Sequence, residues 1–347
     1  MASGVLFLHA LSSMKPKLKS LKDQVIVITG ASSGIGLTTA EMAAEQGAKV
    51  VLSARSESEL IDAAARIRAK GGEALSVAAD VTDEGQVQAL GQQAISRFGR
   101  IDTWVNNAGV GMYGRLIDQP IEDKRKLFET NFWSVVYGCK AAVQQMRTGN
   151  GGVIINLGSE VSDRAAPLLG MYSASKHAVR AYTDTLRMEL EHDGIPIWVT
   201  LVKPGPIDTP FPQHAANYLE HEPKHAPPVY PPEEVARAIL KCAEKPVREV
   251  TVGGVPRLQA AMATIAPRLT DLMMERQMWS EMQSDKPAYS GDSLDAPSGE
   301  DYGRRHGHQP GFESSMYTRA VLSDVVRAAP LIAIGAAVAA RVAASRR

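Results

Sequence analysis

The stretch Val25-Ile26-Val27-Ile28-Thr29-Gly30-Ala31-Ser32-Ser33-Gly34-Ile35-Gly36 decides the fold of this 347-residue chain. Its first four residues form a continuous apolar run, which is typical of a parallel strand buried on both faces. A turn rich in glycine and serine follows, and residues 36–46 then repeat apolar side chains at helical spacing. Glycines at such a turn let the backbone approach a pyrophosphate, and the next helix offers free N–H groups and the positive end of a dipole. The stretch therefore predicts the start of a dinucleotide-binding α/β domain.

Strands and helices alternate through the rest of this domain. Strands are predicted at 49–53, 74–78, 102–105, 153–157, 196–202 and 249–252, and helices at 57–70, 84–97, 121–147, 171–192 and 233–244. Such alternation predicts βαβ units with right-handed crossovers. We expect a doubly wound parallel sheet of the Rossmann type with strand order 3-2-1-4-5-6-7 and a C-terminal helical extension. The Pro-rich residues 204–232 are predicted to form a long loop.

Composition excludes several classes of protein. Apolar residues make up 44% and charged residues 22%, as in a globular protein with a sizeable core. Lys plus Arg and Asp plus Glu both number 38, so no net charge favours nucleic acid as a partner. Cys139 and Cys242 lie in apolar helical patterns and are predicted to be buried thiols, which suits a reducing cytoplasm. His306 and His308 have no further ligands at metal spacing, so no metal site is predicted.

The sequence divides into five predicted segments, which are 1–21, 22–255, 256–283, 284–318 and 319–347. The first carries an apolar run without a preceding positive charge, so we expect no cleaved signal, and Met14 is as good a start as Met1. Residues 256–283 form a Met-rich helical pattern, and 284–318 have the composition of a flexible linker. The apolar run Ala328–Ala340 is shorter than the ~20 residues of a bilayer span. We expect this terminal helix either to dock on the protein or a dimer partner, or to contact a membrane surface.

The end of the second strand contacts the adenosine ribose in a fold of this kind, and an acidic residue there favours NAD. This chain has Arg55 at that place and no carboxylate before Glu57. An Arg suits the 2′-phosphate of NADP, and Ser53, Ser32 and Ser33 offer further hydrogen bonds. The alternative interpretation of Arg55 is a solvated arginine on the protein surface that contacts no cofactor. Asp80, followed by Val81 at the end of the third strand, is expected to accept a hydrogen bond from the adenine amine, the alternative being a helix N-cap.

Tyr172 and Lys176 are four residues apart, which places both side chains on one face of the predicted helix. A phenol has a pKa near ~10, and an ammonium close to it favours the phenolate. The pair is therefore predicted to act as an acid and base, with Ser159 lying 13 residues upstream. For Ser159 the alternative to a role in catalysis is a hydroxyl that caps a turn. For Asn131, which lies between the Asn-Asn-Ala-Gly turn and Ser159 in the sequence, the alternative to such a role is a residue at a helix kink.

Together these motifs resemble the short-chain dehydrogenase/reductase family, over residues 22–255. The matching motifs are TGASSGIG at 29–36, Asp80, NNAG at 106–109, the set Asn131, Ser159, Tyr172 and Lys176, and PGPIDT at 204–209. The cofactor-binding residues that the resemblance implies are Gly30, Ser32, Ser33, Gly34, Ile35, Gly36, Arg55, Asp80, Val81, Asn107, Ala108, Gly109, Tyr172, Lys176, Pro204, Gly205, Ile207 and Thr209. Arg55 and the run at 249–253 look most like the NADPH-dependent 11β-hydroxysteroid-dehydrogenase-like members.

The resemblance implies an NADP(H)-dependent oxidoreductase that interconverts a carbonyl and an alcohol. Tyr172 would transfer the proton, Ser159 would stabilise the substrate oxygen, Lys176 would lower the Tyr pKa and hold the ribose, and Asn131 would orient a water. We expect a small or apolar substrate, with steroid-, retinoid- and lipid-like carbonyls all open, and a dimer or tetramer. Two alternatives remain, a non-catalytic NADPH-binding scaffold and an epimerase or dehydratase. Glu160 beside Ser159 departs from the family pattern and would repel anionic substrates.

Overall fold

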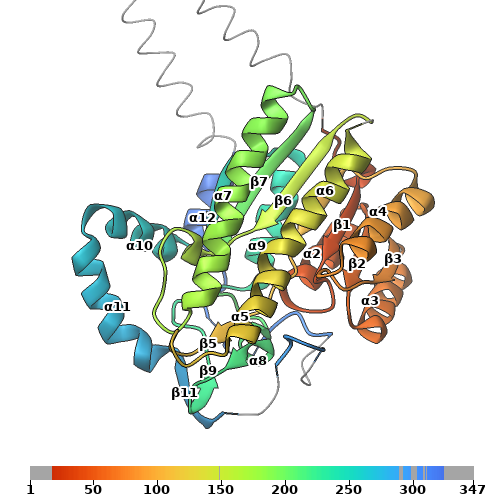
Figure 1. Cartoon of the computed structure of the whole chain (residues 1–347). Helices are drawn as coiled ribbons and strands as arrows, with labels where there is room; N and C mark the ends of the chain where they lie inside the picture. Colours follow the sequence, from red (N-terminus) through yellow and green to blue (C-terminus); the bar gives the residue numbers. More distant parts are fainter. Residues whose placement is uncertain are drawn as a thin grey trace, which may run out of the picture.

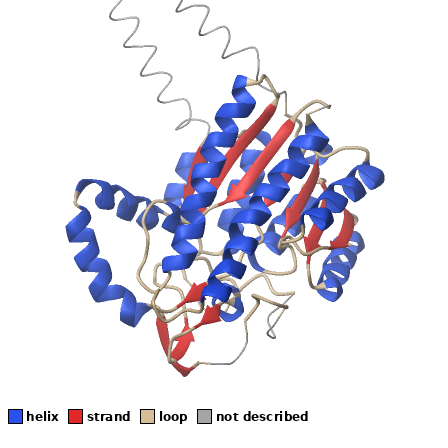
Figure 2. Ribbon diagram, in the orientation of Figure 1, coloured by secondary structure: helices blue, strands red, loops and turns tan. Residues whose placement is uncertain are grey.

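Seven parallel strands form one sheet at the centre of the molecule, with helices on both faces (Figures 1 and 2). The computed structural model describes residues 18–147, 149–288, 292–297, 303–307, 309 and 311–323. In the order in which they lie side by side, the strands are β3 (Glu73–Ala78), β2 (Lys49–Ala54), β1 (Val25–Thr29), β4 (Thr103–Asn106), β6 (Gly152–Leu157), β7 (Ile197–Pro204) and β10 (Glu249–Val252). The predicted strand order is confirmed, because the four short additional strands lie outside this sheet.

Helices α2 (Gly34–Glu45), α3 (Glu57–Ala69) and α9 (Pro232–Glu244) cover one face, and α4 (Glu84–Phe98), α6 (Ser134–Met146) and α7 (Gly170–His192) cover the other (Figure 1). Two apolar cores result, one on each side of the sheet. All five residues of β1 and all six of β6 are buried, as their apolar runs predict. Cys139 and Cys242 are buried free thiols, as predicted.

The carboxyl ends of the strands carry most of the irregular chain. Short elements lie there: β5 (Met112–Tyr113), η3 (Glu160–Ser162), α8 (Phe211–His214), β8 (Ala216–Asn217) and β9 (His221–Pro223). The predicted loop 204–232 therefore contains a helical turn and two short strands, one of which pairs with β5. The N-terminal end of the domain begins with the 3-10 turn η1 (Leu21–Asp23).

One predicted helix is interrupted. The range 121–147 consists of α5 (Ile121–Phe128), a π-helical turn called η2 (Glu129–Trp133) and α6. A π turn inserts one extra residue per turn, and such turns often occur at functional sites. Asn131 lies in this turn, in the middle of a helical segment.

The chain beyond β10 does not end at the sheet. Helices α10 (Gly254–Ile265) and α11 (Pro267–Glu281) form a hairpin that projects from one side (Figure 1), in place of one continuous helix. The break falls at Ala266 and Pro267, where proline cannot continue the first helix. Strand β11 (Gln283–Pro287) then pairs with β9, and α12 (Met316–Leu322) contacts α9 and β10. The domain boundaries themselves stay predictions.

The predicted terminal helix Ala328–Ala340 and residues 1–17 lie outside the described residues. Within the described ranges, no helix is long and apolar enough to cross a membrane.

Candidate active site

A cavity of about 440 Å³ opens along the carboxyl ends of the sheet strands. One end of it is lined by the Gly-rich turn and Arg55, and the other by Tyr172 and the loop after β7. Its walls contain nearly all of the residues predicted to bind a cofactor; the exceptions are Gly36 and Asp80. Residues from places far apart in the sequence therefore meet in one continuous space.

The Gly-rich turn lies too close to its neighbours for any larger side chain. A Cβ at Gly36 would lie 2.2 Å from the carbonyl oxygen of Gly30 and 2.6 Å from Nδ2 of Asn107. Gly30 and Gly34 have φ angles of +66° and +52°, which glycine adopts without strain. Gly36 therefore acts by packing behind the turn, while the backbone at Gly30 and Gly34 faces the cavity, an arrangement that fits a bound pyrophosphate.

The adenosine end of the cavity contains Arg55 but no carboxylate on its wall. Ser53 at the end of β2 has a buried Oγ atom that has no hydrogen-bond partner among the described residues. Val81 lines the cavity, whereas Asp80 does not, and Oδ1 of Asp80 accepts from the N–H and the hydroxyl of Thr82 at 2.9 and 2.8 Å. The helix N-cap at this place is Asp83, which accepts from the N–H of Gln86. Arg55 fits a dinucleotide with a phosphorylated ribose, whereas Ser53 is fully buried and does not line the cavity.

The Asn-Asn-Ala-Gly turn after β4 holds the first strand's end in place. Asn107 Nδ2 donates to the carbonyl oxygens of Thr29 and Gly30 at 2.9 and 3.1 Å. Oγ1 of Thr29 accepts from the main-chain N–H groups of Asn107 and Ala108 at 3.1 and 3.2 Å. These four bonds cross between neighbouring strands, so they fix the floor of the cavity, where Gly109 leaves room beside Lys176.

Tyr172 and Lys176 lie on one face of α7, as predicted, and both line the cavity. Lys176 Nζ donates to the carbonyl oxygen of Leu157 at 2.9 Å and lies 5.7 Å from the centroid of the Tyr172 ring. Burial lowers the pKa of Lys176 to about 8. Burial also raises the pKa of Tyr172 above its ordinary value, a hydrogen bond with Ser159 lowers it, and the charge of Glu160 raises it. In the protein alone, burial therefore outweighs the ammonium that was expected to favour the phenolate.

Ser159 caps a turn, which is the alternative that its sequence position left open; its catalytic role stays a prediction. It is the N-cap of η3, where its Oγ accepts from the N–H of Val161 at 3.3 Å. Its own N–H donates to Oγ of Ser162 at 3.0 Å, which completes a capping box. The bond from Val161 holds the Ser159 side chain beside Tyr172, because rotation of that side chain would break it.

Glu160 follows Ser159 and also lines the cavity. Burial raises the pKa of its carboxyl to about 7, with no ion-pair or hydrogen-bond partner among the described residues to oppose it. A carboxyl in this environment is a strong acceptor for a polar group of a ligand. The sequence marked Glu160 only as a departure from the family pattern.

Asn131 lies beneath the cavity wall and is fully buried. It bonds the main chain of Val110 and Oγ of Ser175, at 3.2 Å for the second. On the opposite side, the loop after β7 brings Pro204, Gly205, Ile207 and Thr209 to the cavity. Gly205 N–H donates to the carbonyl oxygen of Val252 at 3.0 Å, which anchors this loop to β10.

The remaining end of the cavity is mostly apolar. Phe211 lies 5.3 Å from Tyr172 between ring centroids, and its other side stacks on His225 at 6.2 Å. Burial lowers the pKa of His225 to about 4, so the ring is neutral at pH 7. Other residues lining this end are Tyr113, Ala166, Leu169, Met274, Met278 and Met282.

Near this end, Tyr113 lines the cavity, whereas its neighbours Met112, Leu168 and Tyr218 do not. Tyr218 instead donates to Oδ2 of Asp123 at 2.5 Å. The methionines of α11 were visible as a helical pattern, but no signal in the sequence indicated that this helix folds back over the cavity.

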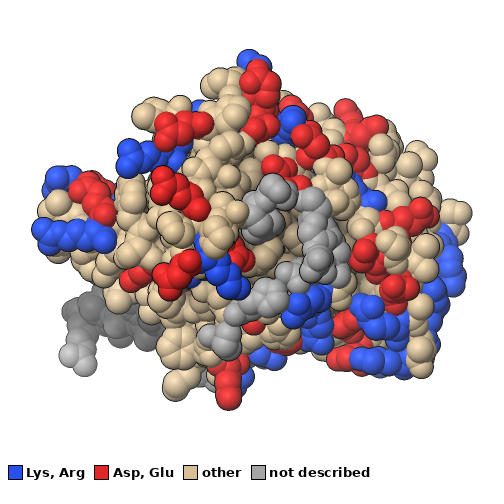
Figure 3. Space-filling view, turned by 90° about the horizontal axis from the view of Figure 1, so that it is seen from below, with Lys and Arg blue, Asp and Glu red and all other residues tan. Residues whose placement is uncertain are grey.

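The surface on this side of the molecule has no uniform charge. Figure 3 views the molecule from below and shows acidic and basic side chains interspersed among uncharged ones. Among the described residues, no group of three or more His, Cys, Asp and Glu side chains is placed to hold a metal ion.

Comparison with known proteins agrees with this geometry. The family model for short chain dehydrogenases matches residues 24–218. An uncharacterized oxidoreductase of Bacillus subtilis, YxnA, is 45% identical over 334 residues, which cover 94% of this chain and 93% of that protein.

Two solved structures have a similar fold. A short-chain dehydrogenase/reductase from Burkholderia phymatum in complex with NAD has a TM-score of 0.62 and 26% identity, covering 79% of this chain and 99% of that one. An alcohol dehydrogenase from the archaeon Thermococcus sibiricus, complexed with 5-hydroxy-NADP, has a TM-score of 0.58 and 29% identity, covering 66% of this chain and 95% of that one. The chain therefore belongs to the short-chain dehydrogenase/reductase family of oxidoreductases, in which nicotinamide cofactors are bound.

Proposed function

We propose that this protein is an NADP(H)-dependent reductase or dehydrogenase that interconverts a carbonyl and an alcohol on an apolar substrate. The observation that carries the proposal is the single cavity that has Arg55 and the Gly-rich turn at one end and Tyr172, Ser159 and Lys176 near the other. The resemblance to the NADPH-dependent 11β-hydroxysteroid-dehydrogenase-like members supports the same cofactor.

The cofactor would lie along the carboxyl edge of the sheet. The N–H groups at the start of α2, apart from that of Gly34, which donates to Arg304, would hold its pyrophosphate, and Arg55 would hold the phosphorylated ribose. A bound nicotinamide supplies or accepts the hydride. Arg55 would make the protein prefer NADP(H) over NAD(H), because a guanidinium forms two hydrogen bonds to a phosphate and cannot pair in this way with a ribose hydroxyl.

Tyr172, Ser159 and Lys176 would each have a separate role in proton transfer to and from the substrate oxygen. Tyr172 Oη donates a proton to the substrate oxygen during reduction and removes it during oxidation. Ser159 Oγ donates a hydrogen bond to the same oxygen and stabilises its developing charge. Lys176, whose pKa of about 8 keeps it mostly protonated at pH 7, supplies the positive charge that favours the Tyr172 phenolate.

The substrate class follows from the walls of the cavity. Phe211, Met274, Met278 and Met282 offer apolar and polarizable contacts to a ring system or an alkyl chain. Glu160 also lines the cavity, so a hydroxyl or an amine on the substrate would find an acceptor there, and its charge would disfavour an acidic substrate.

The proposal is tested by oxidation of NADPH and of NADH with a panel of apolar ketones and aldehydes, including steroids, retinal and fatty aldehydes. The wild-type protein should turn over at least one apolar carbonyl with NADPH. Tyr172→Phe should bind NADPH as before and lose kcat by about a thousandfold or more, because general acid catalysis is removed. Binding of NADPH without turnover of any carbonyl would favour the scaffold, and a Tyr172→Phe variant with a tenth of wild-type kcat would refute the acid/base role.

A further inference from the structure

The chain beyond β11 returns across the cofactor end of the cavity. Its described residues there are 292–297 and 303–307, which we call the strap. At the adenosine end, the guanidinium of Arg55 donates to three main-chain carbonyl oxygens of the strap, those of Ser293 at 2.6 Å, Leu294 at 3.4 Å and Asp295 at 3.2 Å. The side chain of Asp295 accepts from Lys126 Nζ at 2.7 Å. The strap is thus tied to the residue that we propose for cofactor choice.

A second part of the strap crosses the Gly-rich turn. The N–H of Gly34 donates to the carbonyl oxygen of Arg304 at 2.8 Å, and the N–H of Gly303 donates to the carbonyl oxygen of Ser32 at 2.9 Å. Main-chain bonds of this kind require the two segments to lie directly against each other. The strap therefore lies over the turn that would hold the pyrophosphate.

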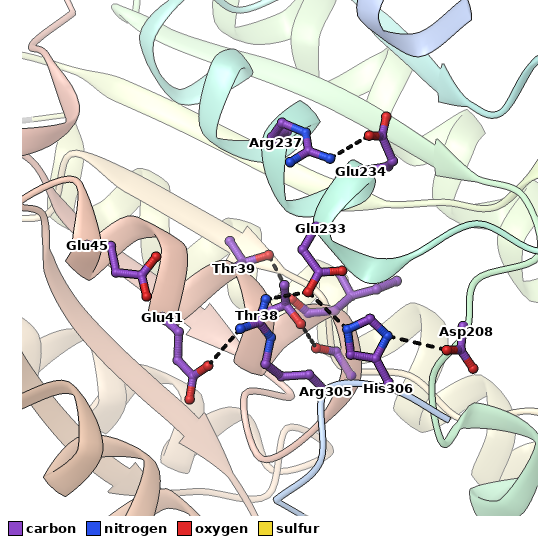
Figure 4. A network of polar contacts seen from close by, with 12 residues as sticks. Thr38, Thr39, Glu41, Glu45, Asp208, Glu233, Glu234, Arg237, Arg305 and His306 are labelled. Carbon is purple, nitrogen blue, oxygen red and sulfur yellow. Dashed lines mark hydrogen bonds and ion pairs between the residues drawn. The ribbon is translucent and has the colours of Figure 1, made fainter. Parts of the chain in front are cut away.

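Charged side chains anchor this second part to three separate elements (Figure 4). Arg305 pairs with Glu41 of α2 at 3.5 Å and with Glu233 of α9. His306 places Nδ1 3.3 Å from Asp208 and Nε2 3.0 Å from Glu233. Glu41 lies in α2, Asp208 in the loop after β7 and Glu233 in α9, so the anchor joins these three elements.

Gly307 makes the closest approach of the strap to the loop after β7. A Cβ at this position would lie 2.6 Å from the carbonyl oxygen of Thr209 and 3.1 Å from Oδ1 of Asp208. The following described residue, Gln309, donates from its N–H to Asp208 Oδ1 at 3.0 Å. Its side chain exchanges hydrogen bonds with the main chain of His225, at 2.6 and 3.1 Å. The strap is therefore connected to both ends of the cavity.

The strap covers the cofactor end of the cavity without filling it. Ser293 and Pro297 line the same space as Arg55 and Gly34. A guanidinium has five N–H donors, so the three bonds from Arg55 to the strap leave two of them for a phosphate. The strap thus binds Arg55 without using all of its donors.

We propose that the strap is a clamp that closes over the bound dinucleotide and slows its release, with Arg305 and His306 as positioning residues that hold the clamp shut. The proposal rests on the proposed function, because it requires that the cleft binds a dinucleotide. Cofactor entry and exit would then need the anchor to open, and weakening the anchor would speed dissociation while leaving the chemistry at Tyr172 unchanged.

The experiment measures NADPH dissociation by stopped-flow fluorescence and affinity by equilibrium titration, for the full chain. The variants are Arg305→Ala, Arg305→Lys and Gly307→Ala, and the matched control is Arg268→Ala, which breaks the exposed pair of Arg268 with Glu275 on α11. We expect Arg305→Ala and Gly307→Ala to raise the dissociation rate and KM for NADPH about tenfold, the scale of one charge-assisted contact. The kcat at saturating NADPH and KM for the carbonyl should change less than twofold or, if release limits turnover, kcat should rise. Arg305→Lys should restore part of the affinity.

Each other outcome overturns the clamp. Folded variants, as judged by thermal melting, whose NADPH dissociation equals that of Arg268→Ala would show that the strap plays no part in binding. Variants that bind NADPH more tightly than wild type would show that the strap obstructs the cleft. A wild-type protein that binds neither NADPH nor NADH would overturn the proposed function together with the clamp, whereas binding by wild type without an effect of the variants overturns the clamp alone.

Discussion

Asn131 and Val110 are joined by two hydrogen bonds, in which Asn131 Nδ2 donates to the Val110 carbonyl oxygen at 2.9 Å and Asn131 Oδ1 accepts from the Val110 N–H at 2.8 Å. The π turn η2 provides the displacement that brings this side chain out of helical register and toward the end of β4. A Cβ at Gly109 would lie 3.2 Å from Asn131 Oδ1 and 3.6 Å from Lys176 Nζ. The amide thus supports the backbone beside the proposed catalytic lysine.

Replacing Asn131 by alanine should lower both stability and turnover. Both main-chain groups of Val110, a buried residue, would lose their partner, which costs about 1–3 kcal/mol for a buried unsatisfied group. Asn131→Asp keeps the acceptor for the N–H but places a buried carboxyl oxygen against the Val110 carbonyl oxygen, so it should not restore the stability. Chemical denaturation and kcat with a good substrate check this. A free energy of unfolding for Asn131→Ala within ~0.5 kcal/mol of wild type would contradict it.

Arg55→Asp should shift the cofactor preference from NADPH toward NADH. The change removes the cation that would pair with a 2′-phosphate and offers an acceptor to the 2′-hydroxyl. The KM for NADPH should rise on the order of tenfold or more, because one charge-assisted contact is lost. Arg125→Asp is the control, since it changes the net charge equally at an exposed site of α5. Equal KM values for NADPH in wild type and Arg55→Asp would exclude this role.

Glu160→Gln should change the pH dependence of alcohol oxidation. The charge of Glu160 contributes to the raised pKa of Tyr172, and its own pKa is about 7. Removing the carboxylate lowers the pKa of Tyr172, so oxidation, which needs the phenolate, should reach half of its maximal kcat/KM at a lower pH in the variant. A pH profile that coincides with that of wild type would mean that Glu160 does not act on Tyr172.

The same variant should reveal the pH dependence of folding stability. In the folded protein the Glu160 pKa of about 7 lies above the ordinary value of 4.5 for a Glu carboxyl, so the folded state binds the proton more tightly than the unfolded state. This contribution is complete below pH 4.5 and is lost as the pH rises through 7. Wild type should therefore lose stability relative to Glu160→Gln between pH 4.5 and 7. His225, whose pKa of about 4 acts in the opposite direction over part of this range, is common to both proteins and cancels.

Gly36→Ala should destabilise the protein by about 1–3 kcal/mol, the cost of inserting a methyl group into a packed region. The added Cβ would lie 2.2 Å from the Gly30 carbonyl oxygen, so the turn must move and affinity for the dinucleotide should fall as well. Gly91→Ala is the matched control, because a Cβ there meets only side-chain atoms at 3.5 and 3.6 Å inside α4. This control should be stabilised by up to ~1 kcal/mol through helix propensity. Equal melting temperatures for the two variants would contradict the packing role of Gly36.

The strap shows why contacts between distant segments resist prediction. Residues 284–318 are rich in Ser, Gly, Pro and Asp, a composition that predicts a flexible linker. In the structure, described residues of this range bond to Arg55, Ser32, Gly34 and Asp208. Most of these bonds involve main-chain atoms of the strap. Because every residue has these atoms, the side-chain composition does not predict such bonds.

The sequence by itself determined the sheet, its strand order and the residues at the edge where ligands bind, because apolar periodicity and glycine turns act locally and parallel βα units assemble in few ways. It also placed Tyr172 and Lys176 on one helix face, since four residues make about one helical turn. Only the tertiary structure decided the ionisation of this pair, because burial, which depends on every neighbour, raises the Tyr172 pKa and lowers that of Lys176. It alone decided that α11 closes the apolar end of the cavity and that the strap roofs the other, since both depend on contacts between residues more than 100 positions apart.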